Sequence, residues 1–270
     1  MTNLPDPDGG SAPRIVYHIG VAGRLGNKLN TAFTRNLSIL AGRGIHAPSR
    51  RVYRPLLRDL VWDEHFTPDA QRETRATISG DSVYDVMVLS NDQALAAKEY
   101  LFADGEFLNW SEKRISRFSE LYADHAITYV IETENFATLI PRMVQYFDPE
   151  QLAYIQESPI GHHSWYDLVA GLSLASPGAA FVIVPGEIVA GRLRAIKSLF
   201  FEPRRPNFLI NRLGSAVSVV THPILGKPAD VEATDLEPIG WYQEHVSRLS
   251  DVYLDDLERL CGLPHVSVVV

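Results

Sequence analysis

Short runs of β-branched residues alternate with longer segments of helical period along most of the chain. The clearest run, residues 15–19, reads Ile-Val-Tyr-His-Ile and leads through a glycine-rich turn into a segment with one apolar stripe. Such alternation is typical of βαβ units, in which helices connect parallel strands and cover the sheet that they form. The pattern therefore predicts an α/β fold with three layers: a mostly parallel central sheet with helices on both of its faces.

The same pattern predicts the individual elements. Strands are expected at 15–19, 83–89, 126–131 and 180–184. The apolar run 266–270 is expected to be an edge strand, with a tail that binds a partner as the alternative. Helices are expected at 27–41, 67–79, 93–100, 111–122, 137–146, 149–157, 164–175, 187–201 and 239–260, with an irregular segment at 202–236. A further short helix is expected to carry Leu56, Leu57 and Leu60. Because short polar side chains satisfy free helix amides, Ser90, Asn91 and Asp92 are expected to cap the helix at 93–100.

Charge and composition exclude several classes of protein. The 270 residues carry a formal net charge of −8, which argues against sequence-independent binding to nucleic acid. The single cysteine, Cys261, excludes an internal disulfide and a cysteine-rich metal site, and it fits a cytoplasmic location. No targeting signal and no membrane span is visible. We interpret residues 1–13 as a flexible tail and residues 14–270 as a single domain.

The turn after the first strand is a candidate site for an anion. It holds three glycines, two basic residues and an asparagine: Gly20, Gly23, Arg24, Gly26, Asn27 and Lys28. Backbone N–H groups at a helix N-terminus attract anions, and glycines let a phosphate approach the backbone closely. The spacing fits neither a Walker loop nor a dinucleotide fingerprint. Glycines between a strand and a helix also serve packing alone, so an anion site and a tight turn are both open.

Several residues around this turn resemble the opening of bacterial sulfotransferase-like proteins. They are His18-Ile19-Gly20, Leu29-Asn30, Phe33, Asn36, Leu40, Gly44-Ile45 and Pro48. In that family the first strand ends in His-Ile-Gly-x-His-Lys-Thr-Gly-Thr-Thr. A weaker similarity covers most of the remaining chain. The resemblance implies a P-loop nucleotide-binding fold of the sulfotransferase type, PAPS as the sulfuryl donor, and a hydroxyl acceptor of carbohydrate type.

The residues that bind the donor in that family are replaced in this sequence. The family's lysine aligns with Gly23, and both threonine hydroxyls that accompany it are missing. The family's arginine and serine for the donor's 3′-phosphate are also missing, because the third strand runs into Glu132 and Leu139-Ile140 follow. A carboxylate repels a phosphate at neutral pH. The resemblance therefore predicts a decayed PAPS site in a pseudoenzyme that binds or regulates.

Two alternative functions stay open. In the first, the chain is an active sulfotransferase in which Arg24 or Lys28 replaces the missing lysine, and Arg24 is the better placed. In the second, the loop Gly23–Lys28 resembles the Gly-x-Leu-Gly-Asn-Gln loop of GDP-fucose-dependent fucosyltransferases. Those enzymes also need a downstream His-x-Arg-Arg motif, which this sequence does not contain. Short motifs of this kind have a high rate of false matches.

Three further groups of residues have both a functional and a structural interpretation. Ser90 ends a strand at the sheet edge where α/β proteins bind ligands, so it could contact the donor instead of capping a helix. His163 could act as a general base, or it could cap a helix together with Ser164. The basic segment 43–58 could bind an anionic nucleotide, a glycan or a protein partner, or it could be a solvated face balanced by acidic neighbours.

Overall fold

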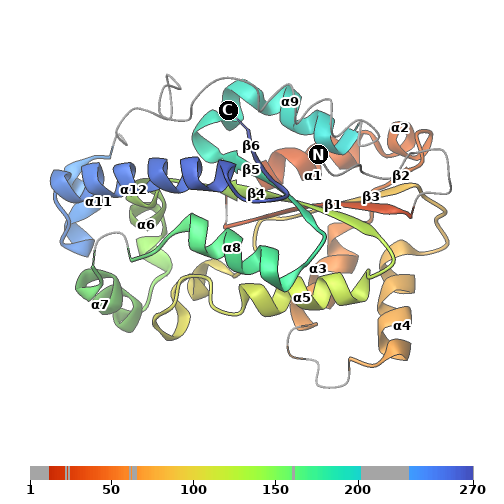
Figure 1. Ribbon diagram of the computed structural model, residues 1–270, viewed down its shortest axis with the longest axis horizontal. Helices are drawn as coiled ribbons and strands as arrows, with labels where there is room; N and C mark the ends of the chain where they lie inside the picture. The colour runs from red at the N-terminus through yellow and green to blue at the C-terminus, as the bar shows by residue number, and fades with distance from the viewer. Residues whose placement is uncertain are drawn as a thin grey trace.

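The computed structural model describes residues 12–21, 23, 25–60, 62, 66–159, 162–201 and 231–269. Within these ranges, six parallel strands form one sheet in the order β2-β3-β1-β4-β5-β6, with helices on both faces (Figure 1). The predicted α/β class and its three layers are confirmed. The predicted tail is described only at Ala12 and Pro13, and residues 202–230 of the predicted irregular segment lie outside the described ranges.

The strands follow the β-branched runs closely. Their bounds are β1 Arg14–Gly20, β2 Ile45–His46, β3 Val86–Asn91, β4 Ala126–Thr133, β5 Ala180–Pro185 and β6 Val266–Val268. Nearly every residue of β1, β3 and β5 is buried, as expected for parallel strands covered on both faces. The C-terminal edge strand is confirmed, because β6 pairs with β5 alone among the described strands. The two-residue strand β2 was not predicted.

Most predicted helices are confirmed to within a few residues. The α-helices of the described residues are α1 Leu25–Arg35, α2 Leu37–Ala41, α3 Arg50–Asp59, α4 Pro68–Ser79, α5 Ser111–Leu121, α6 Phe136–Met143, α7 Pro149–Glu157, α8 Trp165–Ala175, α9 Val189–Phe201, α11 Ala233–Leu236 and α12 Gln243–Cys261. Of these, α11 falls in the segment that was predicted to be irregular. Side-chain hydrogen bonds at the N-cap explain where several of these helices begin. Thr67 accepts a hydrogen bond from the Ala70 amide at the start of α4, and Asp148 forms a capping box with Gln151 at the start of α7.

The helix predicted at 93–100 is wrong. Residues 92–97 form turns and extended chain, and only Lys98–Tyr100 (η1) are helical, as one 3₁₀ turn. The predicted caps are engaged elsewhere: Ser90 and Asn91 belong to β3. The Asn91 side chain accepts a hydrogen bond from the amide two residues later, which closes a short turn instead of starting a helix.

Two other helices differ from the prediction at one end or in the middle. The helix predicted at 27–41 is divided at Asn36, whose side-chain amide donates to the carbonyl of Ala32. The helix predicted at 239–260 begins at Gln243, because Gly240 adopts a left-handed conformation with φ 67° that interrupts the chain direction.

The order of the strands decides where side chains can gather. The chain leaves β1 into α1 and α2 on one face, whereas β3 and β4, the neighbours of β1, lead into α5 and α6–α8 on the other (Figure 1). On the first face α1 packs against α9, with the Phe33 ring 5.6 Å from that of Phe200. The connections thus change from one face of the sheet to the other next to β1. The carboxyl end of a strand at such a change is where α/β sheets usually bind ligands.

No helix in the described ranges is both long enough and apolar enough to cross a membrane.

Candidate functional site

The carboxyl ends of β1, β3 and β4 bring polar side chains together at the centre of the sheet. The parallel register sets His18 beside Ser90 and Gly20 beside Glu132. The side chains of His18 and Ser90 are fully buried, and only 3% of Glu132 is exposed. Buried polar groups of this kind are stable only when hydrogen bonds satisfy them, so their partners define the site.

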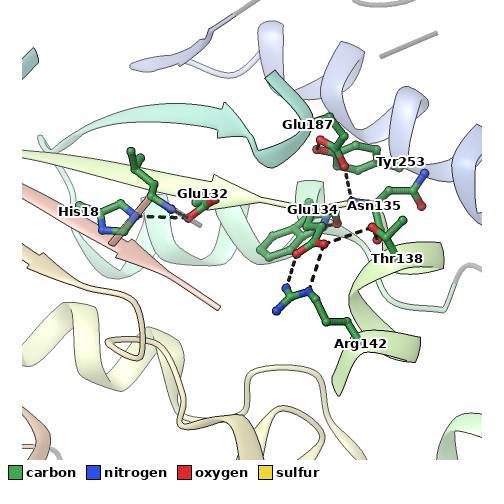
Figure 2. Close-up of polar contacts among 10 residues, drawn as sticks. His18, Glu132, Glu134, Asn135, Thr138, Arg142, Glu187 and Tyr253 are labelled. Carbon is green, nitrogen blue, oxygen red and sulfur yellow. Dashed lines mark hydrogen bonds and ion pairs between the residues drawn. The ribbon is translucent and has the colours of Figure 1, made fainter. Parts of the chain in front are cut away.

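The carboxylate of Glu132 lies at the N-terminus of α1. Its Oε2 atom accepts a 3.0 Å hydrogen bond from the backbone amide of Leu25, the first residue of that helix. The same oxygen lies 3.8 Å from Nε2 of His18 (Figure 2). A helix N-terminus attracts negative charge through its free amides and its dipole. Here the chain supplies that negative charge itself, from a strand 107 residues away in the sequence.

The glycines of the turn fit this arrangement. A Cβ atom on Gly23 would come within 2.0 Å of Glu132 Oε2, so the carboxylate approaches the backbone where a side chain would stand. A Cβ atom on Gly26 would come within 2.9 Å of Asp92 Cβ. Both glycines therefore make room for acidic side chains of the same chain, which is a different use from admitting the phosphate of a ligand.

Ser90 and His18 are occupied with each other. His18 Nδ1 and Ser90 Oγ share a 2.9 Å hydrogen bond. The backbone of Ser90 is held by Tyr53 of α3, whose hydroxyl donates to the Ser90 carbonyl at 2.6 Å and accepts from its amide at 3.0 Å. Serine, histidine and glutamate thus form one row across three strands. Because all three side chains are buried, this row provides no accessible nucleophile.

Two more carboxylates follow on the same edge of the sheet. Glu187, after β5, accepts hydrogen bonds of 3.0 Å from the amide of Asn135 and from the hydroxyl of Tyr253. Burial raises the pKa of the Glu187 carboxyl. Glu134 pairs with Arg142 of α6, whose Nε donates to it at 3.3 Å (Figure 2). The edge beyond β4 therefore carries two further carboxyl groups, of which Glu134 is neutralised by Arg142.

The remaining residues predicted for the turn are placed as follows. Asn27 is exposed and Lys28 is half-buried, both in the first turn of α1. Arg24, the preferred replacement for the missing lysine, lies outside the described ranges. Leu139 and Ile140, which stand where the family has a serine for the 3′-phosphate, are buried in the core.

His163 belongs to a different part of the molecule. Its ring lies among aromatic side chains, 4.9 Å from that of Phe102 and 5.7 Å from that of Tyr154. Its Nε2 atom is buried without a hydrogen-bond partner in the described part of the chain, and burial lowers its pKa to about 4. Ser164 caps α8 by accepting a hydrogen bond from the amide of Asp167. The described residues of the turn do not line the 530 Å³ cavity beside His163.

The arginines of the basic segment 43–58 contact neighbouring polar groups. Arg50 forms a 2.6 Å ion pair with Asp92, and Arg54 donates to the side chain of Gln93. Arg58 pairs with Asp59, the next residue in the chain. These contacts join α3 to the segment that follows β3, close to the site.

Comparison with known proteins identifies no family. No protein-family model matches the chain, and no curated protein matches it. The described residues also contain no cluster of three or more histidine, cysteine or acidic side chains that could hold a metal ion. The geometry at the end of β1 therefore provides the main basis for a functional proposal.

Proposed function

We propose that this chain is a sulfotransferase-like protein that does not hold PAPS and that acts by binding or regulation instead of sulfuryl transfer. The observation that supports the proposal is the place of Glu132. Its carboxylate takes the amide of Leu25 and fills the space beside Gly23, where the resemblance would place the donor's phosphosulfate. A bound donor would have to displace a buried group of its own charge.

The site expected for the donor's 3′-phosphate also supports the proposal. The positions expected to bind the 3′-phosphate are Glu132 and the buried apolar pair Leu139 and Ile140. Glu187 adds a further acid at the end of the neighbouring strand. Both phosphate sites would thus face carboxylates or apolar side chains. The removal of one preorganised donor from an active site lowers the rate of the catalysed reaction by about 10²–10³-fold.

Calorimetric titration with PAPS and with its 3′,5′-bisphosphate product tests the proposal. We expect no saturable binding of either compound by the native chain at concentrations up to about 1 mM, which corresponds to a binding free energy weaker than about −4 kcal/mol. The variant Glu132→Ala removes the carboxylate from the turn, so we expect it to gain measurable binding of the bisphosphate.

The matched control is Glu134→Ala, which removes an acid from the same strand end but leaves the contact between Glu132 and Leu25 intact. This variant should bind no better than the native chain. Micromolar binding of the bisphosphate by the native chain, weakened by Arg24→Ala or Lys28→Ala, would establish the active sulfotransferase instead. Stabilisation by GDP-fucose in a thermal-shift assay would favour the fucosyltransferase.

A further inference from the structure

A second cavity of about 510 Å³ is lined by residues of β1, α3 and α5 and of the chain between β3 and α5. Its wall includes several aromatic and arginine side chains: Tyr17, Arg54, Arg58, Trp62, Trp110 and Arg114. The volume falls in the range of 300–1,000 Å³ that is typical of small-molecule sites. Neither the sequence pattern nor the site around Glu132 explains why these residue types meet here.

Arg114 is the unusual member of this wall. Its Nε atom is buried and has no hydrogen-bond acceptor in the described part of the chain, and no described carboxylate forms an ion pair with it. Burial lowers the pKa of its guanidinium, and the interaction with Tyr17 offsets only part of this effect. A half-buried cation without an ion-pair partner among the described residues favours the binding of an anion.

The other charged groups of the wall leave an excess of positive charge. Arg58 is paired with Asp59, and Arg54 contacts the neutral side chain of Gln93. Asp104 is the one carboxylate among the described lining residues. It is exposed and accepts a hydrogen bond from Asn109, and no ion pair joins it to Arg114.

Two large aromatic side chains of the wall are partly exposed, and the ammonium group of Lys113 lies 5.8 Å from the ring of Trp62 and 5.6 Å from that of Trp110. Trp62 is 55% exposed and Trp110 is 41% exposed, and their rings lie 5.4 Å apart. Trp110 also has a left-handed backbone with φ 71°, a conformation that residues with a bulky side chain rarely adopt. Such strain is often found at ligand sites, where it fixes a side chain in a required position.

We infer that this cavity binds a small organic anion with a flat apolar body, such as an aryl carboxylate, sulfate or phosphate. The charged group faces the guanidinium of Arg114, and the aromatic body packs against Trp62 and Trp110. The inference is independent of the proposed function, because neither Glu132 nor any described residue of the turn lines this cavity.

Calorimetric titration of the full chain with three naphthalene compounds tests the inference. We expect 2-naphthoate or 2-naphthyl sulfate to bind at least tenfold more tightly than the neutral 2-naphthol, and the stronger of the two identifies the preferred charged group. Arg114→Met should weaken binding of that anion at least tenfold. Arg117→Met is the matched control, since Arg117 lies on the same helix but pairs with Glu120 outside the cavity.

Thermal unfolding separates loss of the ligand site from loss of the fold. Because the Nε atom of Arg114 is buried without an acceptor among the described residues, Arg114→Met should not lower the melting temperature of the free protein. Equal binding of the anions and of 2-naphthol would overturn the inference, as would unchanged affinity in Arg114→Met or no binding of either anion at 1 mM.

Discussion

Glu132 satisfies the first amide of α1 and, by the same contact, keeps that amide from binding a ligand. A carboxylate at a helix N-terminus is stabilising, and one that is buried there also prevents a donor from going unpaired. The residue thus has a structural benefit that is independent of any activity. Its effect on stability can be measured separately from its effect on ligand binding.

Removal of this carboxylate should expose an anion site. We expect Glu132→Ala to lower the free energy of unfolding by about 2 kcal/mol, because the Leu25 amide is left buried without an acceptor. Inorganic sulfate at 10 mM should restore part of this loss in the variant but should not stabilise the native chain. Urea unfolding with and without sulfate measures both effects, and equal stabilisation of the two proteins would contradict the expectation.

Protonation of His163 should limit stability at low pH. Burial holds its folded-state pKa near 4, below the value of 6.5 of an exposed histidine, so the unfolded chain binds the proton more readily. Stability is therefore lost as the pH falls from about 6.5 to about 4, by about 3 kcal/mol in all. His163→Phe fits the surrounding aromatic side chains, and its melting temperature should depend less on pH over this interval.

At the scale of elements, the turn between β1 and α1 depends on the absence of a side chain at one position. The Cβ of Gly23→Ala would collide with Glu132 Oε2, whereas a Cβ on Gly191, an exposed residue of α9, would meet nothing within 4 Å. The two glycines therefore differ in kind. Gly23 is needed because the Glu132 carboxylate approaches the backbone closely there, whereas Gly191 only weakens its helix.

A double-mutant cycle tests this difference. We expect Gly23→Ala to destabilise the native chain, but to cost at least about 1 kcal/mol less in the Glu132→Ala background, because the group it collides with is gone. Gly191→Ala should instead stabilise by up to about 1 kcal/mol, since glycine is a poor helix former. Urea unfolding of the four proteins of the cycle gives the coupling free energy between positions 23 and 132. Strict additivity of the two effects would show that other parts of the structure move to avoid the collision.

The elements that could be predicted from sequence are those whose pattern is local. Strands β1, β4 and β5 are continuous apolar runs because both of their faces are buried, and such runs are easily recognised. Strand β2 has two residues and leaves no pattern. The helix at 93–100 was predicted because Ser90 and Asn91 resemble caps, but their side chains bond within the sheet and a turn instead.

The site could be predicted only in part for a related reason. The sequence indicates that Glu132 follows a strand and would repel a phosphate, but its contact with Leu25 joins residues that are far apart in the chain. The cavity at Arg114 is indicated only by Arg54 and Arg58 of the basic segment 43–58, because the rest of its wall comes from β1, α5 and the segments between β3 and α5. Contacts of this kind depend on the order of the strands, which the local pattern does not determine.

At the scale of the whole molecule, the sheet is closed on one side by its last strand. Residues Val268 and Val269 are buried, and the amide of Val269 donates to the carbonyl of Ile183 in β5. Without this strand, β5 would present an unpaired edge. Exposed edges of apolar strands are common sites of association between chains.

Truncation of the chain after Pro264 tests this role. We expect it to lower the free energy of unfolding by about 3 kcal/mol or more, since two buried valines and their backbone pairing are lost. Light scattering should detect larger assemblies than the full chain forms. Ser267→Ala is the control, because it alters a side chain of β6 and keeps the backbone ladder; equal association of both variants would argue against an edge effect.

The central position of β1 has a consequence for synthesis of the chain. This strand is made first among the described strands, yet its two neighbours, β3 and β4, emerge more than 60 and 100 residues later. On the ribosome both of its edges stay unpaired until they arrive, and contacts of such sequence separation form slowly. Until β4 has been synthesised, a chaperone can therefore act on the nascent segment, and a phosphate ion can bind the free amides of α1.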